Sequence, residues 1–170
     1  MEPKLIIEQL ELDGYRIRLL VEGVSPEQAH LKPNPESWSI LEVINHLYDE
    51  EKEDFRAHLI FILNNPTGNW PSIDPQGWVT TRGYNQREVG QSLKNYQAER
   101  KISIDWLKTL DVSDWNEGVT APWGGLITAG DMLSSWASHD LLHMRQFVEL
   151  HHAYVLQLAA PYNVDYAGTW

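Results

Sequence analysis

The sequence predicts an all-α fold, a four-helix bundle whose helices are joined by long connectors. Apolar residues recur with helical periodicity in four long segments, and no run of alternating apolar and polar residues indicates a strand. Stretches rich in proline and glycine separate these segments. The chain has 170 residues, of which 42% are hydrophobic, so we expect a single domain over residues 1–170.

The first two helices are predicted from periodicity and from a cap. Residues 3–21 carry leucine and isoleucine at helical spacing, and the connector GVSPEQAHLKPNPES contains prolines that exclude one continuous helix. Ser39 and Glu42 have the spacing of a capping box, so the second helix should begin at Ser39 and reach about Leu63.

The third helix follows the stretch NNPTGNWPSIDPQGWVTTRGY. A connector of roughly twenty residues is unusually long for a compact domain, which makes it a candidate for shaping a pocket or a partner surface. Asn85 and Glu88 form the next capping pattern, and the helix that they open should close before Asp111.

The fourth helix comes after a second long connector, DVSDWNEGVTAPWGGLITAG. Thr128 and Asp131 are expected to cap it, and it should continue to about Leu158 before Pro161 stops it. The tail YNVDYAGTW is aromatic enough for docking on the body of the domain.

Composition excludes several classes of function. The formal net charge of −11 opposes contact with phosphate backbones, so we expect no nucleic-acid partner. No apolar stretch approaches the length of about 18 residues that spans a bilayer, and the first residues lack the features of a signal peptide, so we expect no membrane partner and a cytoplasmic location. The absence of cysteine excludes disulfides, cysteine-type zinc sites and a catalytic thiol.

Three histidines are the candidate metal ligands. His139 and His143 are four residues apart, so their imidazoles share one helix face and can point at one ion. If His46 of the second helix meets them across the bundle, the three would hold a divalent transition metal with open coordination positions. Spacing alone leaves the alternative open, because a single histidine on an apolar helix face is more often a hydrogen-bonded core residue. We interpret His151 and His152 as surface or capping residues.

Two motifs carry a resemblance to a known family. The pattern W-S-I-x-E-V-x-x-H-L over residues 38–47, followed by H-x-x-x-H-x-x-Q over residues 139–146, resembles the DinB-like (YfiT-like) superfamily of bacterial metal-binding four-helix bundles. The resemblance extends over almost the whole chain, including SPEQAHLKPNPESWSI and the tail. It implies a three-histidine site for zinc, nickel or a similar divalent ion, formed by His46, His139 and His143.

The resemblance also implies a range of activities. Characterised relatives include thiol-dependent transferases and isomerases, such as bacillithiol S-transferases and the mycothiol-dependent maleylpyruvate isomerase. We therefore expect a thiol-dependent S-transferase or a hydrolase acting on a small-molecule substrate, with a low-molecular-weight thiol as a possible cosubstrate. The alternative is a non-catalytic homodimeric bundle that binds a metal or a small ligand, since two-fold dimers are the commonest assemblies.

Two polar residues are candidate catalytic residues beside the histidines. Gln146 lies on the stripe of His139 and His143 and is placed to hydrogen-bond a ligand or a substrate group. Glu50, one turn after His46, is placed to orient an imidazole from outside the ligand set. Each is equally compatible with an ordinary polar residue. Relatives often carry a glycine directly before the glutamine, whereas this chain has Arg145, so its substrate pocket should differ.

Overall fold

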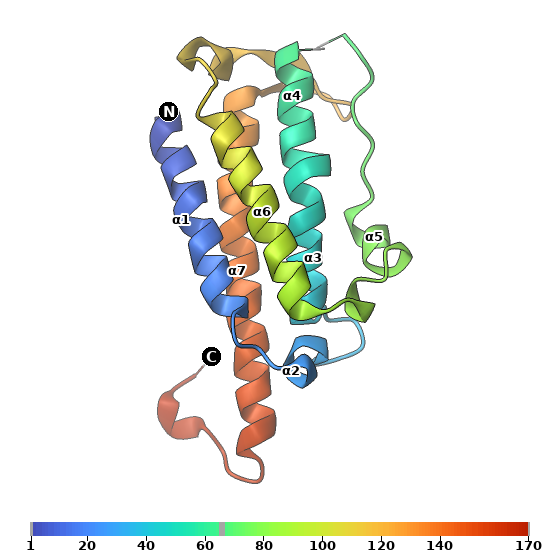
Figure 1. Ribbon diagram of the computed structural model, residues 1–170, viewed down its shortest axis with the longest axis vertical. Coiled ribbons are helices and arrows are strands. Elements are labelled where there is room, and N and C mark those ends of the chain that lie inside the picture. The colour runs from blue at the N-terminus through green and yellow to red at the C-terminus, as the bar shows by residue number, and fades with distance from the viewer. Residues whose placement is uncertain (1, 65–66, 170) are drawn as a thin grey trace.

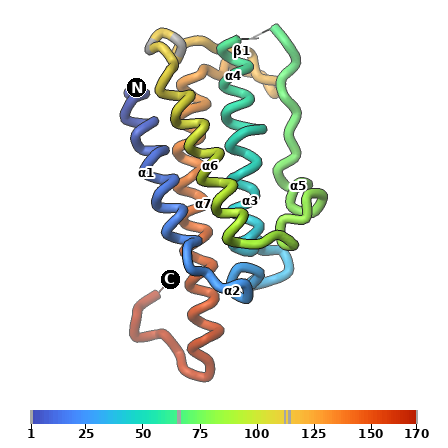
Figure 2. Tube along the Cα trace, viewed as in Figure 1, coloured from blue at the N-terminus to red at the C-terminus, as the bar shows by residue number. Residues whose placement is uncertain are grey.

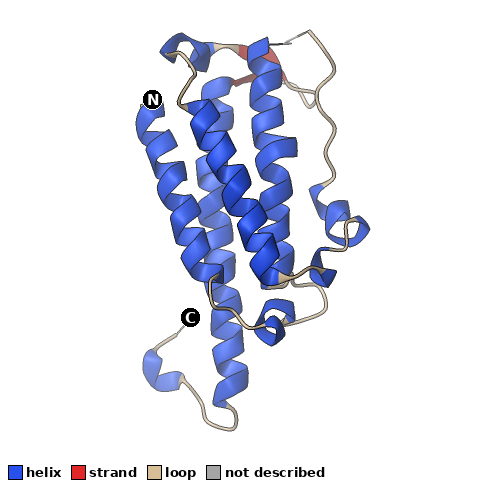
Figure 3. Ribbon diagram, viewed as in Figure 1, coloured by secondary structure: helices blue, strands red, loops and turns tan. Residues whose placement is uncertain are grey.

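The computed structural model describes residues 2–64 and 67–169, and it confirms the predicted four-helix bundle (Figure 1). Helices dominate the described chain, and the strands are confined to one small hairpin (Figure 3). Four long rods form the bundle, and the second of them contains a π-helical turn, η1, between two α-helices. In chain order they are α1 (Pro3–Val21), then α3 (Ile40–Glu50) with η1 (Glu51–Phe55) and α4 (Arg56–Asn64), then α6 (Val89–Leu107), and α7 (Ala129–Ala159).

Two of the three predicted caps are confirmed. At Ser39 the hydroxyl accepts from the Glu42 amide while the Ser39 amide donates to the Glu42 carboxylate, and Thr128 and Asp131 make the same reciprocal pair. The cap predicted at Asn85 is wrong, because Glu88 itself is the N-cap of α6 and accepts from the amides of Gly90 and Gln91.

The four rods run in two parallel pairs (Figure 2). The α1 and α7 pair is parallel, because Leu10 and Asp140 both contact Arg100 whereas Leu20 contacts His151 further along both helices. The rod of α3 and α4 runs parallel to α6 in the same way, with Asn45 bonded to Ser92 and Arg56 bonded to Ser103. The two pairs run in opposite directions, so α1 and α7 are antiparallel to α6 and to the rod of α3 and α4 (Figure 2).

This topology explains the connectors. The chain must return along the whole bundle between α4 and α6, because these helices run in the same direction. Short elements break the connectors: α2 (Pro26–His30) lies before α3, α5 (Pro75–Thr81) and η2 (Tyr84–Gln86) lie in the crossover, and η3 (Val112–Asn116) follows α6. The sequence indicated no strand, but β1 (Gly118–Thr120) and β2 (Leu126–Thr128) form an antiparallel hairpin that is too short to show alternation.

The core consists of two apolar clusters separated by a polar layer. Both clusters contain residues of α1, α6 and α7; the cluster around Trp136 adds residues of η1 and α4, and the cluster around Phe147 adds residues of α3. Between their levels lie buried charged side chains, among them Asp13, Arg100 and Asp140. This polar layer lies beside the candidate site.

Two expectations about the end of the chain are wrong. In the tail, which includes η4 (Asp165–Ala167), Tyr162 is 82% exposed and Tyr166 is fully exposed, so these aromatic rings do not dock; Trp170 lies outside the described residues. His151 is not a surface or capping residue, because its Nε2 donates to the Leu20 carbonyl at 2.6 Å and its Nδ1 accepts from Gln28 at 2.8 Å. It ties α7 to α1 and α2.

Within residues 2–64 and 67–169, no helix has both the length and the apolar composition needed to cross a lipid bilayer.

Candidate metal centre

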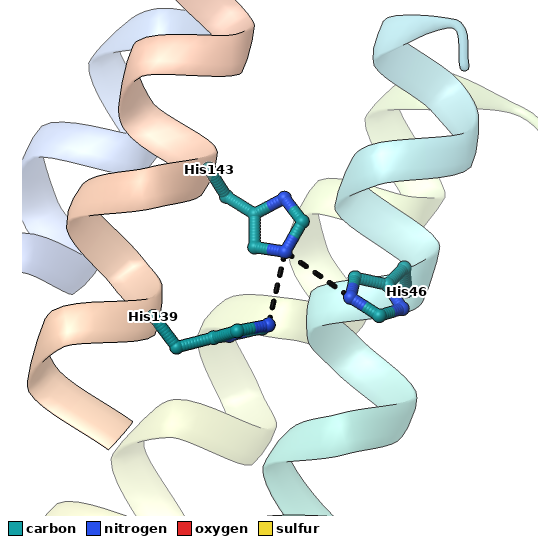
Figure 4. A group of neighbouring side chains, drawn as sticks. All are labelled: His46, His139 and His143. Atoms are coloured by element: carbon teal, nitrogen blue, oxygen red, sulfur yellow. Dashed lines mark hydrogen bonds between the residues drawn. The ribbon is translucent and has the colours of Figure 1, made fainter. Parts of the chain in front are cut away.

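Three imidazoles from two rods converge on one point (Figure 4). The Nε2 atom of His143 lies 3.1 Å from Nε2 of His46 and 3.0 Å from Nε2 of His139. One ligand atom from each residue lies within 4.8 Å of the others. The juxtaposition of α3 and α7 that the sequence left open is thus present, and His46 is the most buried of the three at 4% exposure.

The environment keeps two of these rings neutral. Burial, reinforced by the proximity of His143 and His139, lowers the pKa of His46 to about 2. Burial and the neighbouring His139 lower the pKa of His143 to about 4, although its hydrogen bond to Gln146 opposes this shift. At neutral pH both rings are therefore uncharged imidazoles, which is the form that binds metal ions.

Gln146 controls the orientation of one ring. Its Oε1 lies 2.8 Å from Nδ1 of His143, so the Nδ1 proton is donated to the amide oxygen and the lone pair is left on Nε2, facing the other rings. On His46 the buried Nδ1 has no hydrogen-bond partner among the described residues. Only the Nε2 side of His46 is engaged.

Glu50 lies on the side where the nitrogens converge. Its Oε2 is 3.0 Å from Nε2 of His139 and 3.4 Å from Nε2 of His46. Burial raises the pKa of Glu50, although the hydrogen bond to His139 opposes the shift. The Glu50 carboxylate thus faces the ring nitrogens at the centre of the cluster.

Two aromatic side chains enclose the cluster. The Trp38 ring meets His46 edge-on with centroids 4.8 Å apart and lies parallel to His143, and Phe55 lies 5.1 Å from the ring of His139. These contacts restrict the imidazole rotamers, which a preorganised site requires.

A cavity of about 820 Å³ opens onto the cluster. Its walls come from the first connector, from the start of α5 in the crossover and from one face of α7, and much of the lining is apolar. Arg145 lines it as well, with its Nε 3.3 Å from the Glu149 carboxylate. The apolar lining residues are Pro33, Trp38, Pro75, Leu142, Leu150 and Ala153.

The donor set suits a divalent transition metal. Two nitrogens bound at about 2.0–2.1 Å in a tetrahedral site stand about 3.3–3.4 Å apart, close to the Nε2 separations of 3.0 and 3.1 Å. Neutral imidazoles are typical ligands of zinc and of neighbouring metals. The open cavity leaves room for a further small ligand.

All five residues singled out in the sequence, His46, Glu50, His139, His143 and Gln146, lie together around this point. The long connector that the sequence marked as a candidate for shaping a pocket does so, because its residues Pro75 and Gln76 line the cavity; which of its residues would reach the cavity was not indicated locally. Sequence reasoning missed Trp38 as a wall, although that residue begins the motif that contains His46.

Comparisons with known proteins agree with this architecture. A family model described as the DinB superfamily matches residues 9–147. Among solved structures, YfiT from Bacillus subtilis, described as a probable metal-dependent hydrolase with an unusual four-helix bundle topology, aligns with a TM-score of 0.79 and 20% identity over 89% of this chain and 86% of that chain. At that identity the likeness establishes the fold. No curated protein gives a significant match.

Proposed function

This chain belongs to the DinB superfamily, and from that premise we propose that His46, His139 and His143 bind one divalent transition metal ion, zinc or nickel, in an enzyme that acts on a small molecule. The observation that carries the proposal is the convergence of three Nε2 atoms, two of them on rings held neutral, at an open cavity of about 820 Å³.

The chemistry follows from the donor set. A divalent ion held by neutral imidazoles keeps its positive charge and lowers the pKa of a coordinated water or thiol. Glu50 is placed to accept the proton of that nucleophile, because its carboxylate faces the point where the nitrogens converge and its pKa is raised by burial. Gln146 holds His143 in the tautomer with a free Nε2.

We favour hydrolysis as the reaction, with thiol transfer as the second candidate. In hydrolysis, water adds to an acyl carbon, the bond to the leaving group breaks, and Glu50 passes the proton to that group. A low-molecular-weight thiol would use the same steps, with a new carbon–sulfur bond. The absence of cysteine is compatible with this second route, because the chain itself supplies no thiol.

The cavity lining supports a substrate that has both an apolar and a polar portion. Apolar side chains, Trp38 among them, line part of its wall, and polar side chains line the rest. Among the described residues that line it, Arg145 is the one cation, and it pairs with Glu149, whereas Glu36 adds a further carboxylate at the rim.

Exposed aliphatic side chains on two helices favour the alternative of a homodimeric bundle that binds a metal or small ligand without turnover. Exposed aliphatic side chains recur every seven residues along the parallel helices α1 and α7, which suits burial against a second copy. They are Leu5, Leu12 and Leu19 on α1 and Leu141, Val148 and Val155 on α7, each 40% to 59% exposed. Sedimentation of the wild type and of Leu12→Glu would test this face; a wild-type monomer would contradict it.

The metal site is tested by metal analysis of protein purified without an affinity tag. We expect about one divalent ion per chain, and we expect His139→Ala and His143→Ala to lose it. His30→Ala is the matched control, because His30 is an exposed histidine of α2 outside the cluster. Full metal occupancy in a His139→Ala, His143→Ala double variant would refute the site.

Activity separates the two reactions. Turnover of aryl esters and amides by the metal-loaded protein without added thiol would identify a hydrolase. Turnover of an electrophile such as a haloarene only with bacillithiol, mycothiol or glutathione would identify a transferase. A metal-loaded protein that is inactive throughout both panels would favour the non-catalytic alternative.

A further inference from the structure

Arg100 of α6 joins all four rods of the bundle at one level. Its Nε donates to Glu51 of η1 and one terminal nitrogen forms an ion pair with the same carboxylate at 2.9 Å, and its two terminal nitrogens form a fork with Asp140 of α7 at 2.5 and 2.9 Å. A further hydrogen bond reaches the carbonyl of Leu10 on α1 at 2.9 Å. A guanidinium carries five N–H donors, and four of them are used in these hydrogen bonds.

The two carboxylates that Arg100 holds are the immediate neighbours of the candidate site. Glu51 follows Glu50, whose carboxylate faces the histidines, and Asp140 follows His139. Arg100 therefore grips the two rods that supply the site, next to one site residue on each rod. All three members of this group are buried, with Arg100 5%, Glu51 1% and Asp140 0% exposed.

The backbone of α1 is shaped to admit this side chain. A Cβ added at Gly14 would lie 3.0 Å from Cγ of Arg100, tighter than ordinary packing allows. A glycine inside a helix costs about 0.5–1 kcal/mol relative to alanine, so its presence here matches the close passage of the arginine. The position of Arg100 is fixed from the side of α1 as well as by its ion pairs.

Stability alone does not account for such a group. Replacing a buried set of charges by well-packed apolar residues is often neutral or stabilising, because removing charges from water is costly. A guanidinium fork differs from apolar packing in one respect, since it fixes the direction and the separation of its partners.

We propose that Arg100 is a positioning residue for the metal centre. By gripping Glu51 and Asp140 it sets the separation of η1 and α7, and with it the spacing between His46 and Glu50 on one side and His139 and His143 on the other. This inference rests on the proposed function, because it assigns the residue a role through the metal-binding histidines.

The test measures binding of Co²⁺ alone to wild type, Arg100→Lys and Arg100→Met, with thermal melting by circular dichroism as a check of folding. Lysine keeps the charge but has three donors and no planar fork, so we expect Arg100→Lys to fold, to bind Co²⁺ about tenfold or more weakly and to show an altered visible spectrum. Arg56→Lys is the matched control, because Arg56 ties α4 to α6 and its hydrogen bonds within the described residues end on α6.

The outcomes separate this inference from the proposed function. Wild-type affinity and spectrum in Arg100→Lys would overturn the positioning role, and so would an equal loss in Arg56→Lys. If Arg100→Met does not fold, Arg100→Lys decides. A wild type that binds no Co²⁺ would refute the proposed function instead. In that case a crystal structure of Arg100→Lys would test the positioning role, and unchanged separations between the three Nε2 atoms would overturn that role.

Discussion

Replacing Gln146 by leucine should weaken metal binding without unfolding the protein. The Gln146 oxygen accepts a hydrogen bond of 2.8 Å from Nδ1 of His143. Such a bond between neutral groups contributes about 1 kcal/mol, and one to a charged group about 1.5–3 kcal/mol. A metal ion on Nε2 polarises the imidazole toward the charged case, so the bond strengthens by about 0.5–2 kcal/mol when the ion binds. Its loss should weaken ion binding about 2- to 30-fold.

The measurement is a competition for Zn²⁺ between the protein and a chromophoric chelator at fixed pH. Gln146→Glu supplies a stronger acceptor at the same place and should bind Zn²⁺ more tightly than Gln146→Leu. Gln157→Leu is the matched control, because Gln157 is an exposed glutamine of α7 that does not line the cavity. Equal Zn²⁺ affinity in Gln146→Leu and wild type would refute the orienting role of this hydrogen bond.

Three further predictions concern other parts of the molecule. Glu50→Gln should retain its metal but lower kcat about 10²- to 10⁴-fold if Glu50 is the proton acceptor; unchanged kcat with full metal content would contradict that role. Burial lowers the pKa of His58, but hydrogen bonds to the Asp54 carboxylate and to a backbone carbonyl outweigh burial and raise it, so protonated His58 contributes its full stabilisation below about pH 6.5 and loses it as the pH rises through the folded-state pKa. In urea unfolding, the free energy of unfolding of the wild type should therefore fall over this pH range, and the fall should be smaller in His58→Gln. Identical pH profiles of the two proteins would contradict this role of His58. Gly14→Ala should lower the melting temperature despite the better helix propensity of alanine, because the new Cβ meets Arg100 at 3.0 Å; a higher melting temperature would show that the arginine can move aside.

Local signals in the sequence were sufficient where a short segment determines its own structure. Ser39 and Thr128 each start a helix through contacts with a residue three positions later, so their patterns could be recognised directly. Asn85 shows the limit of this reasoning. Its side chain accepts a hydrogen bond from the Ser39 hydroxyl at 2.6 Å, a contact across 46 positions that no local pattern contains. Glu88, already within reach of two free amides, caps the helix instead.

Helix direction could not be read from the four periodic segments alone. The rod from Ile40 to Asn64 has 25 residues and is about 37 Å long at 1.5 Å per residue. Because α6 runs in the same direction, the chain has to cover that length again before Val89. The long connector is thus a consequence of parallel neighbours, and its passage along the bundle brings Pro75 and Gln76 to the cavity. The length of the connector predicted a role in shaping a pocket. That the connector crosses the bundle between parallel helices could not be predicted, because helix direction is visible only in the tertiary structure.

The acidic run EEKED in the second rod shows why the remainder of the site was hidden. On a regular helix, successive residues point about 100° apart, and such a run indicates a solvated face. In the structure Glu50 is 4% and Glu51 1% exposed, and the π-helical turn begins between them. One carboxylate faces the histidines, and the other faces the guanidinium of Arg100. The cost of burying these two carboxylates is offset by partners distant in sequence, His139 of α7 for Glu50 and Arg100 of α6 for Glu51. The segment whose sequence looks most like a solvated surface therefore connects the candidate site to the rest of the bundle.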